Sequence, residues 1–151
     1  MILNDFFLPC LAALLACFGF SLLYNIHGRN IPIASLCGAF GWAIYLITDA
    51  LSASMVVPYF CAGAAIALYA EIAAYFFHSP ITVYLIPGII PLVPGLTIYR
   101  TMDACLTADL YLFGNGLFAT LKIGGAITLG LIFTSSLFRL IKNGMSKPSV
   151  K

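Results

Sequence analysis

Charged side chains are scarce in this sequence. Of its 151 residues only 8% are Asp, Glu, Lys or Arg, whereas 62% are hydrophobic and the mean hydropathy is +1.06. A soluble domain carries about 25% charged residues, so this chain lacks the polar side chains that would cover a soluble surface. Its formal net charge of +2, without a basic patch among aromatics, excludes a nucleic-acid partner. The composition predicts an integral protein of a lipid bilayer.

Motifs for metal binding and catalysis are also missing. The cysteines form no CxxC pair and neither histidine lies beside one, so we expect no metal site and no cofactor. There is no HExxH motif, no GxSxG motif and no acid-rich cluster. We therefore expect that the protein is not an enzyme, and we interpret the cysteines as small core residues.

Long apolar runs dominate what is present. The hydrocarbon core of a bilayer takes about 20 helical residues, and the predicted spans cover residues 6–26, 31–48, 56–77, 81–99 and 117–140. The sequence therefore predicts an all-α membrane protein, with residues 1–151 forming a single integral membrane domain, a bundle of about five transmembrane helices. A longer linker, 100–116, precedes the last span, and Asp103 and Asp109 indicate that it is exposed to water. The spacing of Leu106, Leu110 and Phe113 predicts a short surface helix in this linker.

Positive charge gathers after the last span. Cytoplasmic segments carry an excess of Lys and Arg, so we expect a cytoplasmic C-terminus in the cytoplasmic (inner) membrane and, after an odd number of crossings, an N-terminus outside. Arg100 then falls on the outer side, against the rule. The residues that carry the bias are Arg139, Lys142, Lys147 and Lys151.

The fourth span concentrates residues that break helices. Pro87, Pro91 and Pro94 lie close together, and Gly88 and Gly95 directly follow two of them. An interior proline removes one helical N–H and clashes with the carbonyl four residues back, at about 3 kcal/mol or more. The glycines allow the dihedrals that a break needs. We therefore expect the fourth helix to be discontinuous.

A break of this kind predicts a functional element. The prolines remove the usual donors of the carbonyls of Val83, Pro87 and Ile90. Irregular backbone survives at membrane depth where it is buried in protein or lines a watery cavity, and transporters build ligand sites from it. The alternative is a kinked helix that serves packing alone. The residues interpreted as a substrate pathway or gate are Pro87, Gly88, Pro91, Pro94, Gly95 and Tyr99.

Glu71 is the second unusual residue. It is the only Glu in the chain and lies inside the third predicted span. An intramembrane carboxylate is a functional candidate by default. Because burial favours the uncharged carboxyl, we interpret Glu71 as a candidate for coupling to a proton gradient. The alternative is a structural hydrogen bond to an exposed carbonyl or to a neighbouring helix.

These segments resemble a known family. The stretch AEIAAYFFHSP, followed by ITVYLIPGIIPLVPGLTIY, is similar to the C-terminal membrane half of the threonine/serine exporter family. The whole chain resembles the free-standing small subunit of the split version, an organic-acid (succinate-type) exporter. The most specific part is PGIIPLVPG, Pro87 to Gly95.

The resemblance implies a secondary transporter that exports small amino acids (threonine or serine) or small carboxylates, driven by the proton gradient. It also implies a partner, a large membrane subunit with a cytosolic N-terminal domain. A higher oligomer is compatible with the sequence, and a channel is not excluded by it. The runner-up from another class is a membrane scaffold that assembles a partner and transports nothing.

Overall fold

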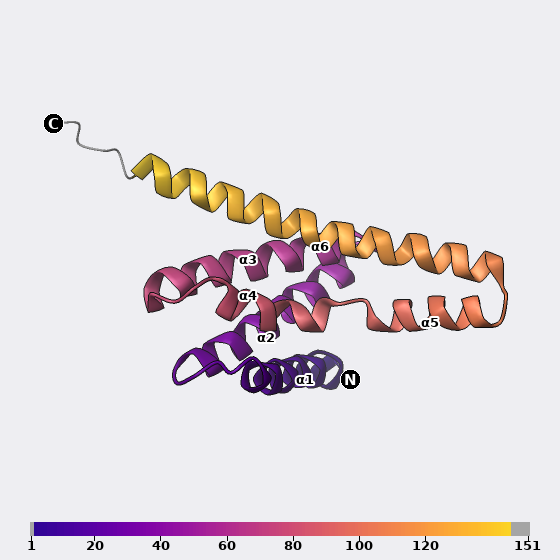
Figure 1. Cartoon of the computed structure of the whole chain (residues 1–151), viewed down its shortest axis with the longest axis horizontal. Coiled ribbons are helices and arrows are strands. Elements are labelled where there is room, and N and C mark those ends of the chain that lie inside the picture. The colour runs from indigo at the N-terminus through magenta and orange to yellow at the C-terminus, as the bar shows by residue number, and fades with distance from the viewer. Residues whose placement is uncertain (1, 146–151) are drawn as a thin grey trace.

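The chain folds into helices alone throughout the part described by the computed structural model, residues 2–145 (Figure 1). Four helices are long and apolar enough to cross a membrane, and a bent pair of shorter ones makes up to 5 spans. The expected all-α membrane bundle with a broken fourth span is confirmed. The positive charges expected at Lys147 and Lys151 lie outside the described residues. The elements are α1 (Ile2–Leu23), α2 (Asn30–Leu51), α3 (Val57–Phe77), α4 (Thr82–Ile89), the short 3₁₀ helix η1 (Ile90–Leu92), α5 (Gly95–Leu106) and α6 (Leu110–Met145).

The helices run back and forth between two ends of the bundle. At the first, here called the Asn30 end, Asn30 Nδ2 donates a hydrogen bond to Ser79 Oγ at 3.2 Å and joins the start of α2 to the segment after α3. α6 finishes there too, because Lys142 Nζ lies 5.8 Å from the centre of the Tyr75 ring of α3. The opposite end, here called the Met55 end, holds Met55 in the turn between α2 and α3. α1 begins at the Met55 end, so the described chain starts and finishes at opposite ends (Figure 1).

Small residues bring α3 and α6 into backbone contact. A side chain on Gly63 would place its Cβ 2.9 Å from the carbonyl oxygen of Ile127, and one on Gly130 would collide with the carbonyl of Phe60. Lipid is as apolar as the helices, so helices associate in it by close packing between small residues. α3 lies centrally, since it packs against α2 and α4 as well as α6.

The structure corrects the segment after the broken span. α5 continues past the predicted span end at Tyr99, and α6 begins well before the predicted start at residue 117. Residues 100–116 are therefore two helix ends and a short turn, not a linker with its own surface helix. Asp109, whose charge indicated a wet linker, instead caps α6, because its Oδ1 accepts the N–H of Leu112 at 3.0 Å. Asp109 therefore belongs to the turn that joins α5 to α6.

α5 and the first part of α6 (residues 110–120) form an antiparallel pair, here called the α5–α6 hairpin. The two backbones approach closely, since a side chain on Gly116 would collide with Thr101 Oγ1. The hairpin projects beyond the rest of the bundle at the Met55 end (Figure 1). α5 packs chiefly on α6, whereas α4 packs on α1, α2 and α3. The two halves of the broken span therefore pack against different helices.

Candidate functional site

The fourth span bends between η1 and α5. Its two halves, Thr82–Leu92 and Gly95–Leu106, meet at 53°. Val93 has extended backbone, and the Gly95 N–H donates to the Val93 carbonyl at 2.7 Å in a tight turn around Pro94. Pro87 and Pro91 instead lie within α4 and η1. Of the three prolines, Pro94 is therefore the one at the bend.

Two of the carbonyls freed by the prolines find other donors inside the protein. The Pro87 oxygen accepts the thiol of Cys17 at 3.1 Å and also the N–H of Ile90. The Ile90 oxygen accepts the N–H of Val93 at 3.2 Å. The expectation that the prolines leave open carbonyls is corrected for these two, because a tighter helical turn and a side chain of α1 replace the missing donors. In this conformation they are not free ligands.

Gly88 lies where four helices meet. A Cβ on Gly88 would lie 2.9 Å from Cys37 Sγ and 3.2 Å from Ile66 Cγ2, and a Cβ on Gly38 would lie 3.6 Å from the Gly88 Cα. Cys37 and Ile66 are near the middle of α2 and α3, so α4 reaches the middle of the bundle at Gly88. Cys17 and Cys37 are fully buried, which confirms them as core residues, whereas the interpretation is wrong for Cys105, which is exposed near the end of α5. From this packed centre the chain continues through η1 to the bend at Pro94.

A hydrogen-bonded chain closes the Asn30 end. The Tyr84 hydroxyl, on a fully buried side chain, donates to Asn30 Oδ1 at 2.7 Å, and Asn30 in turn donates to Ser79 Oγ. Ser79 donates to the Phe77 carbonyl at 3.3 Å. This network ties α4 to the start of α2 and the end of α3. Sequence reasoning missed it, because its residues are far apart along the chain and the only signal was that Asn30 and Ser79 are polar and lie close to the ends of predicted spans.

Glu71 lies on a different face of α3 from the broken span. Ile66 packs on Gly88 of α4, and Glu71, five residues later, is turned about 140° around the helix axis. It follows Ala64 by about two turns, and Ala64 contacts Gly130 of α6. Glu71 is half-buried on this α6-facing side, and no hydrogen bond or ion pair of its carboxyl is seen within residues 2–145. The structure therefore does not bring Glu71 and the Pro-Gly segment together.

The predicted pathway residues do not surround one cavity. Pro87 and Gly88 are buried in the core, and Pro91 and Pro94 are half-buried. Gly95 is exposed, and Tyr99 is 68% exposed. The segment thus runs from the centre of the bundle outward to the hairpin.

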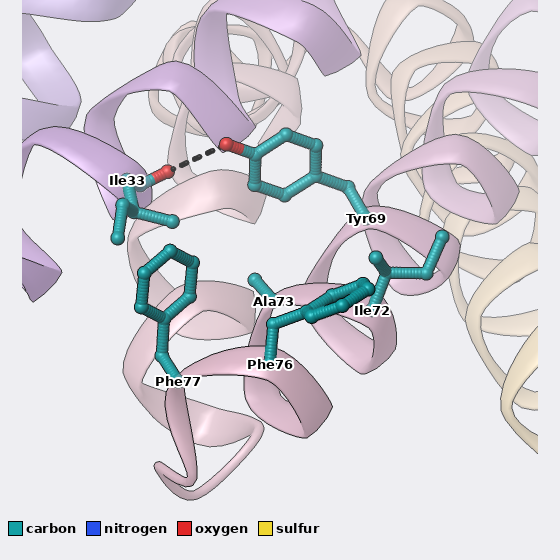
Figure 2. Close-up of a pocket in the computed structure, with 6 residues that line it drawn as sticks. All are labelled: Ile33, Tyr69, Ile72, Ala73, Phe76 and Phe77. Carbon is teal, nitrogen blue, oxygen red and sulfur yellow. Dashed lines mark hydrogen bonds between the residues drawn. The ribbon is translucent and has the colours of Figure 1, made fainter.

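A cavity of about 530 Å³ lies between α2 and α3, and Figure 2 shows the residues that line it. The Tyr69 hydroxyl points across its rim and donates to the Ile33 carbonyl at 3.3 Å, which uses its one proton. The remaining lining side chains are apolar: Ile33, Ile72, Ala73, Phe76 and Phe77. This cavity offers little to a polar solute.

A smaller hollow adjoins the break. It measures about 300 Å³, and Trp42 and Pro91 both line it. The indole N–H of Trp42 is buried and has no hydrogen-bond partner among residues 2–145, which is costly unless water or a ligand reaches it. Trp42 stacks on Tyr45 with ring centres 5.1 Å apart, and Tyr45 lies 4.8 Å from Tyr59, so an aromatic row leads toward the Met55 end. Sequence reasoning did not identify this row.

These features define a class of protein. A multi-pass bundle of apolar helices contains a broken span whose first half, α4, reaches its centre, and no group of metal-ligating residues is found in the described chain. The chain belongs to the threonine/serine exporter family: the family model described as Threonine/Serine exporter, ThrE, matches residues 9–137. No curated protein and no solved structure matches the chain significantly. The protein is thus a membrane transporter of the threonine/serine exporter type, and its family is not a family of enzymes.

Proposed function

We propose that this chain is one subunit, formed as a single membrane domain, of a proton-coupled secondary transporter. Its partner is a large membrane subunit with a cytosolic N-terminal domain, and its cargo is a small polar metabolite. The observation that carries the proposal is the 53° break, which starts from a packed centre in a chain of an exporter family. Broken helices near mid-membrane serve transporters as sites and gates.

The break supports a gating role because its two sides are held differently. α4 is fixed by the Cys17 thiol on Pro87 and by the Tyr84–Asn30 hydrogen bond. α5 rests chiefly on α6 and projects from the bundle. A rotation at Val93 and Pro94 would therefore move α5 relative to α4, and α6, which is continuous from the hairpin to its contact with α3, would bend or shift with it. Such motion around a few element-terminal residues is how many proteins open and close.

Glu71 is suited to couple protons to this motion. It faces α6, and α6 carries the hairpin. Protonation removes a charge from the contact between α3 and α6, so it changes how the two helices pack. The effect would reach the hairpin through α6 itself, without a contact between Glu71 and the prolines.

Charge supports the expected orientation in the inner membrane. Arg29 and Lys142 lie at the Asn30 end, and Asp103 and Asp109 lie at the Met55 end. From the bias toward cytoplasmic Lys and Arg we propose that the Asn30 end lies inside, with Arg100 at the Met55 end as the exception. If the partner's membrane half starts from the inside, the two halves are inverted repeats with substrate between them. Reporter fusions to both termini test this, and finding both ends on one side excludes it.

The deciding experiment is metabolite efflux. Cells that express this chain with and without a large partner subunit are loaded with threonine, serine or succinate, and release is followed over time. We expect faster release of at least one of them with the pair. A pair that assembles in the membrane and moves none of the three would instead support the scaffold. Threonine or serine release favours the amino-acid form of the exporter, and succinate release the organic-acid form.

A further inference from the structure

The helix α4 and the turn η1 form one short unit between two irregular joints. The unit covers Thr82–Leu92 and ends at the bend formed by Val93 and Pro94. The joint before it runs from His78 to Ile81, and His78 has a φ of 49°, which is uncommon for a residue other than glycine. A few residues at the ends of elements can absorb large changes in backbone dihedrals. The unit can therefore rotate as a body while α3 keeps its own structure.

The ring of Tyr84 on this unit lies in a socket of small side chains. It is fully buried and packs with Ala34 of α2 and with Ala70 and Ala73 of α3. Alanine methyl groups surround the ring without interlocking with it. The directional contact at this end of α4 is the hydrogen bond that the Tyr84 hydroxyl donates to Asn30 Oδ1 at 2.7 Å. A single neutral hydrogen bond has a small net strength, so it can break and form again.

Asn30 connects this hydrogen bond to the joint before α4. Its amide donates to Ser79 Oγ at 3.2 Å, and Ser79 lies in the joint. The side chains of Tyr84, Asn30 and Ser79, here called the Tyr84 latch, therefore bond across both sides of the joint. While the latch is made, the joint cannot rotate freely.

Two buried thiols lie behind the latch, in the packed centre of the bundle. The Cys17 thiol donates to the Pro87 carbonyl at 3.1 Å, and Cys37 Sγ would lie 2.9 Å from a Cβ on Gly88. Both cysteines are fully buried and lie against α4. If α4 rotated away from α2 at the Asn30 end, it would uncover both thiols from that end.

We propose that the Tyr84 latch is a second gate, at the Asn30 end, which complements the bend at Pro94. This inference rests on the proposed export function, because alternating access needs a barrier on each side of the transported molecule. The latch is closed in this conformation. When it opens, Tyr84 leaves the alanine socket, the unit rotates on its two joints, and the centre around Gly88 opens toward the Asn30 end.

The native cysteines of the chain can report this motion. The full chain, in membrane vesicles of either orientation, is treated with a charged maleimide that does not cross the bilayer, and mass spectrometry gives the labelling rate of each cysteine. Cys105, exposed near the end of α5, marks the side of the Met55 end in the same sample. Tyr84→Phe keeps the ring and loses the O–H. Labelling of Cys17 in this variant is about three- to tenfold faster than in the unmodified chain, from the side opposite to Cys105, as expected for one lost hydrogen bond.

Tyr69→Phe is the matched control. It also removes a tyrosine hydroxyl, which donates to the Ile33 carbonyl at 3.3 Å, but this bond joins α3 to α2 and leaves α4 untouched. The labelling rate of Cys17 in this control stays within twofold of the unmodified chain. Asn30→Ala raises the rate as Tyr84→Phe does, and the two changes together add little more, because both remove the same bond.

Three results would overturn the second gate. The first is an unchanged labelling rate of Cys17 in Tyr84→Phe, and the second is labelling from the same side as Cys105. The third is an equal acceleration in Tyr69→Phe, which would indicate a generally loosened core. None of them touches the export function, since the labelling uses no cargo. A complex that releases no metabolite from cells contradicts the export function itself, which the efflux experiment reports separately.

Discussion

The Cys17 thiol of α1 donates a hydrogen bond to the carbonyl oxygen of Pro87 in α4, across 70 positions of the chain and at 3.1 Å. Pro91 has no N–H to give this carbonyl, so the thiol and the Ile90 N–H take its place. Proline and cysteine therefore act together, and the first half of the broken span is anchored to α1.

Replacing this thiol tests the anchor. We expect Cys17→Ala to lower the free energy of unfolding by about 1–3 kcal/mol, because a buried carbonyl loses a donor and a small void opens. Cys17→Ser keeps a donor of similar size and loses less. Thermal unfolding of the purified protein in detergent measures both, with Cys105→Ala at an exposed position as the control. Equal melting temperatures for all three variants would contradict the anchoring role.

Gly88 tests the packing at the centre. A Cβ at this position meets Cys37 Sγ at 2.9 Å and Ile66 Cγ2 at 3.2 Å, so Gly88→Ala forces neighbours apart at a cost of about 1–3 kcal/mol. Gly124→Ala is the matched control, since nothing lies within 4 Å of its added Cβ. Thermal unfolding is again the measurement. Equal melting temperatures for Gly88→Ala and Gly124→Ala would mean that α1 to α4 are less tightly packed around Gly88 than the structure indicates.

Pro94 tests the bend. Pro94→Ala restores an N–H that can bond the Ile90 carbonyl, which favours a continuous helix from α4 to α5. We expect export to fall by about tenfold or more, since a loss of about 1.4 kcal/mol in the moving step already gives that factor, while the protein still inserts. Pro32→Ala, at an exposed first-turn position of α2, is the control. Unchanged export after replacing Pro87, Pro91 and Pro94 together would mean that the break serves packing alone.

Glu71 tests the proton coupling. Glu71→Gln keeps the shape of the side chain but cannot ionise, so we predict that it abolishes proton-driven export and leaves membrane insertion intact. Asp49→Asn, at the exposed end of α2, should export normally. Efflux from energised cells is the measurement, and insertion is checked in membrane fractions. Full activity of Glu71→Gln would falsify the proton role.

The fold was largely predictable because its signals are local. Apolar runs define the spans, and the closely spaced prolines predict a break in the fourth span, although only Pro94 lies at the bend itself. The donors to Pro87 were not predictable, since Cys17 reaches it only through the packing of α1 on α4. The extent of α5 and α6 was missed because charge at Asp103 and Asp109 indicated a linker, whereas the contact of Thr101 with Gly116 keeps the two helices together.

The candidate site was predictable only in part. The Pro-Gly segment follows from the sequence, but the Tyr84–Asn30–Ser79 network and the Trp42 row depend on how distant helices meet. Glu71 stood out as the only Glu, yet its direction toward α6 becomes clear only from the contact of Ala64 with Gly130. The role proposed for Glu71 and for the prolines remains a prediction.

The length of α6 ties this protein to the thickness of its membrane. With 36 residues at about 1.5 Å each, the helix measures about 54 Å, whereas the hydrocarbon layer is about 30 Å deep. To fit its full length inside the hydrocarbon layer, α6 would need a tilt greater than the range of about 0–40° seen for spanning helices. Part of α6 must therefore stand in the headgroup layer or in water, and a thicker bilayer would immerse more of it.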